Sequence, residues 1–167
     1  FPWCYEMPVD TKGQAQLESG FSIHQATLED VDDLAILFDK YRQFYQEDAD
    51  LTLAKGYLRA RLSDSSSVVF IARSAKGVAL GFTQLYATFC SVEAAPIMVL
   101  YDLFVDAECR RLGVGKGLMN RAQAHAIDSG AARIDLETAI DNINAQQLYE
   151  ALGYVRDTEF YKYSLSL

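Results

Sequence analysis

Residues 110–117, Arg-Arg-Leu-Gly-Val-Gly-Lys-Gly, combine positive charge with closely spaced glycines. They follow an apolar, strand-like stretch that ends Leu103-Phe104-Val105, and they precede a helical pattern. The first N–H groups of a helix lack intrahelical acceptors, and the helix dipole behind them favours anions. Glycine also lets an anion approach the backbone closely. This segment therefore predicts a phosphate-binding turn, in preference to a glycine-rich turn that carries surface cations only.

Two common phosphate motifs do not fit this segment. A Walker A motif needs a glycine where Arg110 stands and a serine or threonine where Gly117 stands. The dinucleotide-binding fingerprint needs a third glycine at the position of Leu118. What remains is the pattern Arg-x-x-Gly-x-Gly, built from Arg110, Gly113 and Gly115 after an apolar strand.

A second motif lies downstream, separated from the glycine-rich turn by one predicted helix and one predicted strand. It reads Asn142-x-x-Ala145-x-x-Leu148-Tyr149-x-x-x-Gly153-Tyr154. Together and in this order, the two motifs resemble the signature of the GNAT superfamily of N-acetyltransferases. The resemblance extends over about residues 21–167.

The resemblance implies that acetyl-coenzyme A lies between the strand that ends at Val105 and the strand that starts near Arg133. The backbone of Leu103, Phe104 and Val105 would bind the pantetheine arm, which the Asn142 side chain would also reach. The pyrophosphate would contact the residues of the turn, which are Arg110, Arg111, Leu112, Gly113, Val114, Gly115 and Lys116. A backbone N–H near Val105 would polarise the thioester carbonyl.

Catalysis, by the same resemblance, is direct attack of a primary amine on the thioester through a tetrahedral intermediate. The Tyr149 hydroxyl would protonate the departing thiolate. The alternative for Tyr149, a tyrosine that only packs on a short amphipathic helix, stays open at this stage.

Two carboxylates are candidates for the base that accepts the proton of the amine, since an alkyl ammonium has a pKa of about 10. Glu137 ends the strand before Asn142, where several relatives keep a glutamate. Asp102 interrupts an apolar strand beside the cofactor segment. In diamine acetyltransferases that strand resembles Leu-Glu-Asp-Ile-Tyr-Val, whereas here Tyr101 replaces the glutamate and Asp102 is kept. Either acid could equally be a carboxylate with a structural role only.

The acceptor site is expected to be aromatic and acidic. In this family the first helices, one hairpin and the C-terminal strands line it, and these segments are rich in aromatic residues: Tyr41, Phe44, Tyr45, Tyr86, Phe89, Phe160, Tyr161 and Tyr163. With Glu47, Asp48 and Asp50 close in sequence, such a pocket could hold a cation, although core packing explains each aromatic residue singly.

Hydrophobic periodicity predicts the elements that position these residues. Strands are expected over 21–25, 68–72, 78–89, 97–105, 133–138, 154–156 and 160–165, and helices over the segment after Thr27, 51–62, 113–129 and 145–152. Hairpin-like strands in the middle and strand–helix pairs near the end indicate a mixed sheet with helices on both faces. The implied fold is the α/β GNAT fold, with six or seven mostly antiparallel strands and about four helices.

The 167 residues suit one domain. The opening Phe1-Pro2-Trp3-Cys4-Tyr5 is unlike the rest of the chain, and residues 12–20 are polar without apolar periodicity. Residues 1–20 are therefore interpreted as a flexible leader or an expression-derived segment, and residues 21–167 as the acetyltransferase domain. Fifteen basic against 23 acidic residues give a net charge of −8, which disfavours nucleic acid and suits a small cationic amine. The apolar runs are too short to span a membrane.

The three cysteines and two histidines lack ligand spacing, so no metal is expected. A reducing, cytoplasmic location is the default. A homodimer stays open, since family members are often dimers. Two other functions stay open as well: acetylation of a protein or peptide amine, and a non-catalytic acyl-coenzyme A-binding module.

Overall fold

A computed structural model of the chain describes residues 20–167, so the predicted leader lies outside the described residues except for Gly20. Its centre is a five-stranded sheet with the strand order β1-β2-β3-β4-β5. The strands are β1 (Phe21–Gln25), β2 (Val68–Ser74), β3 (Ala79–Cys90), β4 (Ala95–Val105) and β5 (Ile134–Leu136). The first four pair antiparallel, and β5 pairs parallel to β4.

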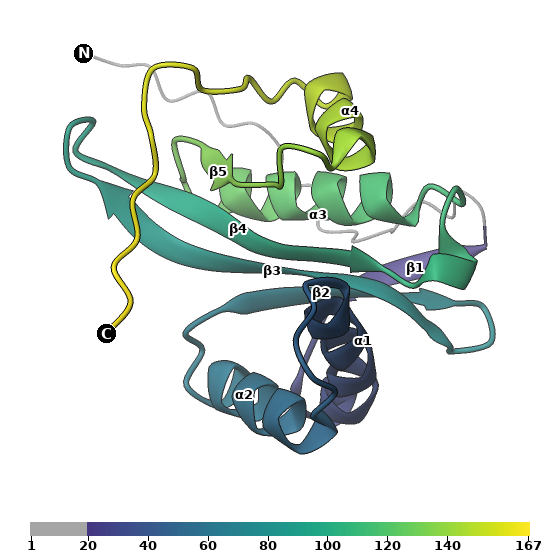
Figure 1. Cartoon of the computed structure of the whole chain (residues 1–167). Coiled ribbons are helices and arrows are strands. Elements are labelled where there is room, and N and C mark those ends of the chain that lie inside the picture. Colours follow the sequence, from purple (N-terminus) through teal and green to yellow (C-terminus); the bar gives the residue numbers. More distant parts are fainter. Residues whose placement is uncertain (1–19) are drawn as a thin grey trace, which may run out of the picture.

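Helices cover both faces of this sheet (Figure 1). On one face lie α1 (Val31–Phe44) and α2 (Leu51–Ser63), and on the other lie α3 (Val114–Asp128) and α4 (Ile143–Ala151). Each face has its own apolar core. In the core on the α1 and α2 side, Leu34, Leu58 and Phe82 are fully buried. In the core on the other side, Leu118 of α3 is fully buried.

Two irregularities of β4 open the sheet at one end. The register between β3 and β4 shifts after Gln84, because Tyr101 is an extra residue on β4 that forms a β-bulge. Parallel pairing with β5 covers only Met98, Val99 and Leu100, while β4 itself continues to Val105. The last five residues of β4 therefore have no β5 neighbour, and the two strands part there.

The turn between β4 and α3 depends on one glycine. Gly113 is the N-cap of α3 with φ of 82°, a left-handed conformation that residues with a side chain rarely adopt. Gly117 has a different role, because a Cβ there would come within 3.0 Å of Ile23 and 3.1 Å of Phe21 on β1. Two glycines of one motif thus serve the turn and the helix–sheet contact respectively.

Most predicted elements are confirmed within a residue or two, and the fold class is α/β as expected. The predicted strands over 154–156 and 160–165 are wrong, because residues 154–165 form no helix or strand, and the aromatic side chains of Phe160, Tyr161 and Tyr163 are exposed. The sheet accordingly has five strands in the described residues rather than six or seven. The alternation of Tyr161, Tyr163 and Leu165 with polar residues favours a strand only where a neighbouring strand pairs with it.

Candidate active site

The opening between β4 and β5 is the centre of the candidate site. A pocket of about 340 Å³ lies where the end of α1 faces the loop before α4, and its lining includes Phe44, Tyr45 and Asn142. The predicted pantetheine-binding residues, Leu103, Phe104 and Val105, pair with β3 and lack a β5 neighbour on their other side. Their backbone can therefore bind an extended ligand at this edge.

The predicted phosphate turn leads directly into α3, a helix of 15 residues. Its first intrahelical hydrogen bond runs from the Gly117 N–H to the Gly113 carbonyl at 2.9 Å, so the N–H groups of the preceding turn point beyond the helix end. Arg110 donates from Nε to the Val105 carbonyl at 3.3 Å, which ties the turn to the end of β4. This geometry suits an anion next to the opening.

Gly115 is the position in this turn that leaves space for a ligand. A Cβ placed there would meet only the Leu148 and Val105 side chains, at ordinary contact distances of 3.6 and 3.8 Å. No contact within the described residues therefore requires a glycine at position 115, and a small side chain would fit there.

Asn142 is the N-cap of α4 in this structure. Its Oδ1 accepts from the Ala145 N–H at 3.4 Å, and its Nδ2 donates to the Thr138 hydroxyl at 3.3 Å. Both contacts are long, and Asn142 also lines the pocket at the opening. The cap orients Asn142 at this position whether or not it contacts a ligand.

Tyr149 on α4 is buried, with its ring 6.0 Å from that of Tyr154. Burial raises the pKa of Tyr149 to about 12, with a smaller contribution from Tyr45, the C-cap of α1. Its hydroxyl therefore stays protonated at neutral pH and can only donate a proton. The core-packing alternative is compatible with the same burial, so the burial alone does not separate the two roles.

Asp102 lies at the bulge of β4, on the side that faces α1. Burial raises the pKa of its carboxyl group to about 6, against the opposing hydrogen bond from Tyr41. Among the ion pairs of the described residues, none includes Asp102. A half-buried carboxylate without a cation costs stability, which points to a role beyond packing.

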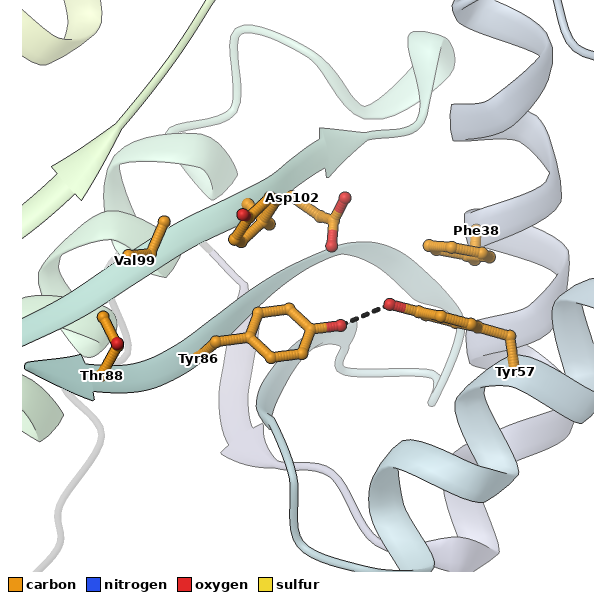
Figure 2. A pocket seen from close by; sticks show the side chains of 7 residues that line it. Phe38, Tyr57, Tyr86, Thr88, Val99 and Asp102 are labelled. Atoms are coloured by element: carbon orange, nitrogen blue, oxygen red, sulfur yellow. Dashed lines mark hydrogen bonds between the residues drawn. The ribbon is translucent and has the colours of Figure 1, made fainter. Parts of the chain in front are cut away.

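Asp102 opens into a second pocket of about 440 Å³. The pocket is lined mainly by aromatic side chains from α1, α2, β3 and β4, and its complete lining is Phe38, Tyr57, Tyr86, Thr88, Val99, Tyr101 and Asp102. Figure 2 shows the Asp102 carboxylate directed into the space between the Phe38 and Tyr86 rings. The Tyr57 and Tyr86 hydroxyls are hydrogen bonded to each other, and Gln84 donates to Tyr86.

Glu137, the other candidate base, is exposed in the loop after β5. It forms an ion pair with Lys162 of the C-terminal segment. Glu137 is not among the residues that line either pocket. Its carboxylate is already neutralised by a cation, whereas that of Asp102 is not.

Sequence reasoning missed several residues of this pocket. Phe38 and Tyr57 stack with ring centroids 5.3 Å apart, and Gln84 is fully buried beneath Tyr86. Glu47, Asp48 and Asp50, which were expected to make the acceptor site acidic, are not in the lining of this pocket.

The sequence matches the model of the acetyltransferase (GNAT) family over residues 31–154. The chain belongs to this family. As a GNAT protein it is an acyltransferase enzyme, and the matched region includes both motifs and the whole opening between β4 and β5.

Individual relatives agree with this assignment. The chain is 42% identical to the uncharacterized N-acetyltransferase YhfO of Bacillus subtilis (strain 168), over 87% of this chain and 97% of that protein. It is 27% identical to an aminoglycoside N(6')-acetyltransferase type 1 of Stenotrophomonas maltophilia, over 83% and 88% of the two chains. A crystal structure of a probable acetyltransferase superposes with a TM-score of 0.82 at 38% identity, covering 87% of this chain and 97% of the other.

The described residues contain neither a metal-binding cluster nor a membrane-spanning helix. No group of three or more His, Cys, Asp or Glu side chains there is arranged to hold a metal ion. No helix in residues 20–167 is both long and apolar enough to cross a membrane.

Proposed function

We propose that this GNAT enzyme transfers acetyl from acetyl-coenzyme A to the primary amine of a small cationic molecule held at Asp102. The observation that supports this proposal most is Asp102 itself, a carboxylate without a cation in an aromatic pocket next to the parting of β4 and β5. An incoming ammonium supplies the missing positive charge.

The residues present fit acetyl-coenzyme A, which supplies the acetyl group as a thioester. The backbone of Leu103, Phe104 and Val105 would hold the pantetheine arm along the free edge of β4, with Asn142 on the opposite side. The turn residues Arg110 to Lys116 at the α3 N-terminus would hold the pyrophosphate. The space at Gly115 supports this assignment, because no contact within the protein requires a glycine there.

Asp102 is the base in this proposal, and Glu137 is not. With a pKa of about 6, Asp102 is mostly ionised at neutral pH and can accept the ammonium proton at a carboxylate oxygen, directly or through water. Glu137 is paired with Lys162 outside both pockets. The amine loses its charge as Asp102 gains a proton, so a nucleophile forms beside the thioester.

Tyr149 is the acid in this proposal. Tyr149 is protonated at working pH and lies on α4, within electrostatic range of Tyr45, which lines the pocket at the opening. Donation of its proton to the departing sulfur removes the negative charge that would otherwise develop in a partly dehydrated site.

A thiol-release screen tests the proposal. Purified protein with acetyl-coenzyme A is offered primary amines, aminoglycosides, amino acids and lysine peptides, and acetylated products are identified by mass spectrometry. We expect turnover with a small amine, and loss of it in Asp102→Asn but not in Asp128→Asn, a matched change on the exposed end of α3. Turnover confined to lysine peptides would favour a protein or peptide acceptor instead.

A further inference from the structure

The acceptor pocket carries one negative charge. Of the seven residues that line it, Asp102 alone is charged at neutral pH. A molecule with a single ammonium group neutralises that charge, whereas a second ammonium on the same molecule would have to be desolvated without a partner.

Two acids that could have added negative charge to the pocket form other interactions. Asp50 caps α2, with its carboxylate accepting from the Leu53 N–H at 2.9 Å. Glu47 forms an ion pair with Arg42 at 3.7 Å. These two acids follow α1 in sequence but contribute no lining to the pocket, so they offer no second site for a cation there.

Charged groups next to the lining are already compensated. Lys162, which lies within electrostatic range of Tyr101, is paired with Glu137. Arg61 lies 5.7 Å from the centre of the Tyr57 ring and is paired with Asp64 at 3.3 Å. Each of these two ion pairs is neutral overall, so neither leaves an unpaired carboxylate for a second ammonium.

Flat rings form the rest of the wall. Phe38 and Tyr57 stack at an interplanar angle of 5°, and the Tyr86 and Tyr101 rings meet nearly perpendicular at 5.3 Å. Gln84, fully buried, donates to the Tyr86 hydroxyl, which is bonded in turn to that of Tyr57. This chain of hydrogen bonds fixes two walls of the pocket in place, and aromatic rings form most of the lining that faces a ligand.

We infer that the acceptor is a monoamine, a single primary ammonium on an apolar or aromatic body, rather than a polyamine or an aminoglycoside. The inference rests on the proposed function, since it assigns the pocket at Asp102 to the acceptor. Ring–ring and ring–methylene contacts with Phe38, Tyr57 and Tyr86 bind the body, and Asp102 binds the ammonium. The wall formed by Tyr57 and Tyr86 determines which bodies fit.

Matched amines test the inference. Hexylamine and 1,5-diaminopentane have the same number of non-hydrogen atoms in a row and differ only at the far end, which is a methyl group in the first and an ammonium group in the second. Benzylamine, spermidine and kanamycin extend the comparison. We expect kcat/KM for both monoamines to exceed that for each polycation at least about tenfold. Binding of hexylamine to the protein saturated with coenzyme A, followed by calorimetry, should likewise be tighter than that of the diamine.

A variant that adds a second negative charge to the pocket provides a further test. Thr88 is exposed and lies at the end of the pocket away from Phe38 and Tyr57 (Figure 2). Thr88→Asp should move the preference toward 1,5-diaminopentane by about tenfold relative to hexylamine, because it offers the second ammonium a partner. Thr88→Asn, the uncharged control, should leave the ratio of the two amines unchanged.

The possible results distinguish a failure of the monoamine inference from a failure of the proposed acetyl transfer. A wild-type preference for diamines or kanamycin overturns the monoamine inference and leaves the acetyl transfer intact. An equal shift in Thr88→Asp and Thr88→Asn also overturns it, since the effect would not depend on charge. Coenzyme A binding without turnover of any amine overturns the proposed function and the inference with it.

Discussion

The ionised, largely buried carboxylate of Asp102 lowers the stability of the folded protein. Its carboxyl group is ionised at neutral pH although burial favours the protonated form, as its pKa of about 6 against an ordinary 3.8 indicates. The folded protein therefore binds this proton more tightly than the unfolded chain does. Stability falls as pH rises through the interval between these two values, and the full cost is present above pH 6.

Replacement of Asp102 by asparagine should consequently stabilise the protein at pH 7.5. Two pKa units correspond to about 3 kcal/mol, and partial exposure reduces this to on the order of 1–2 kcal/mol. Urea unfolding at pH 7.5 and at pH 4 measures the effect, which should nearly vanish at pH 4. Asp128→Asn should show no gain at either pH, and a destabilised Asp102→Asn at pH 7.5 would contradict the cost assigned to this carboxylate.

Tyr149 can be tested by the removal of one oxygen. Tyr149→Phe keeps the buried ring but cannot donate a proton, so kcat should fall on the order of 10²-fold while the affinity for coenzyme A stays the same. Steady-state kinetics and calorimetry measure the two quantities. Tyr163→Phe, on the exposed C-terminal segment, is the control. Full turnover in Tyr149→Phe would mean that Tyr149 serves only in core packing.

At the scale of elements, the turn before α3 couples fold and ligand binding. Gly115→Ala should fold normally, since its Cβ meets only ordinary contacts. Gly115→Glu should weaken coenzyme A binding at least about tenfold, because a carboxylate would meet the pyrophosphate, while a negative charge in the first turn of α3 would not destabilise the helix. Calorimetry with thermal unfolding decides this, and unchanged affinity in the folded Glu variant would rule out the phosphate site.

Gly117 provides the opposite control in the same motif. A Cβ there would come within 3.1 Å of the Phe21 and Ile23 side chains, so Gly117→Ala should lower thermal stability by roughly 1 kcal/mol or more through overpacking. Its effect on coenzyme A binding should be smaller than that of Gly115→Glu. The reverse order of effects would mean that the two glycines have been assigned the wrong roles.

Local motifs made the positions of the proposed cofactor-binding residues predictable from sequence. Gly113, Asn142 and Tyr149 take their positions from turns and caps whose requirements lie within a few residues. The acceptor side was less accessible, because Phe38, Tyr57 and Gln84 meet only through the packing of α1 and α2 on β3. The prediction of C-terminal strands was wrong for a related reason. Aromatic alternation shows that a segment is compatible with a strand, but a strand forms only where a neighbouring strand pairs with it.

At the scale of the whole molecule, the net charge of −8 should attract a cationic acceptor. Raising the ionic strength from about 0.01 M to 1 M shortens the Debye length from about 30 to 3 Å, so kcat/KM for a monoamine should fall several-fold. A neutral hydrazide with the same apolar body should change much less. Equal salt dependence for the two acceptors would remove the electrostatic contribution from the account.

The most direct test of the account is the pH dependence of kcat/KM for the best amine, in the wild type and in Asp102→Asn. If ionised Asp102 accepts the ammonium proton, wild-type kcat/KM should rise up to about pH 6 and then level off toward the amine pKa of about 10. The variant must use the rare free amine, so its kcat/KM should be lower and continue to rise about tenfold per pH unit above pH 6. Parallel profiles for the two proteins would contradict the assignment of Asp102 as the base.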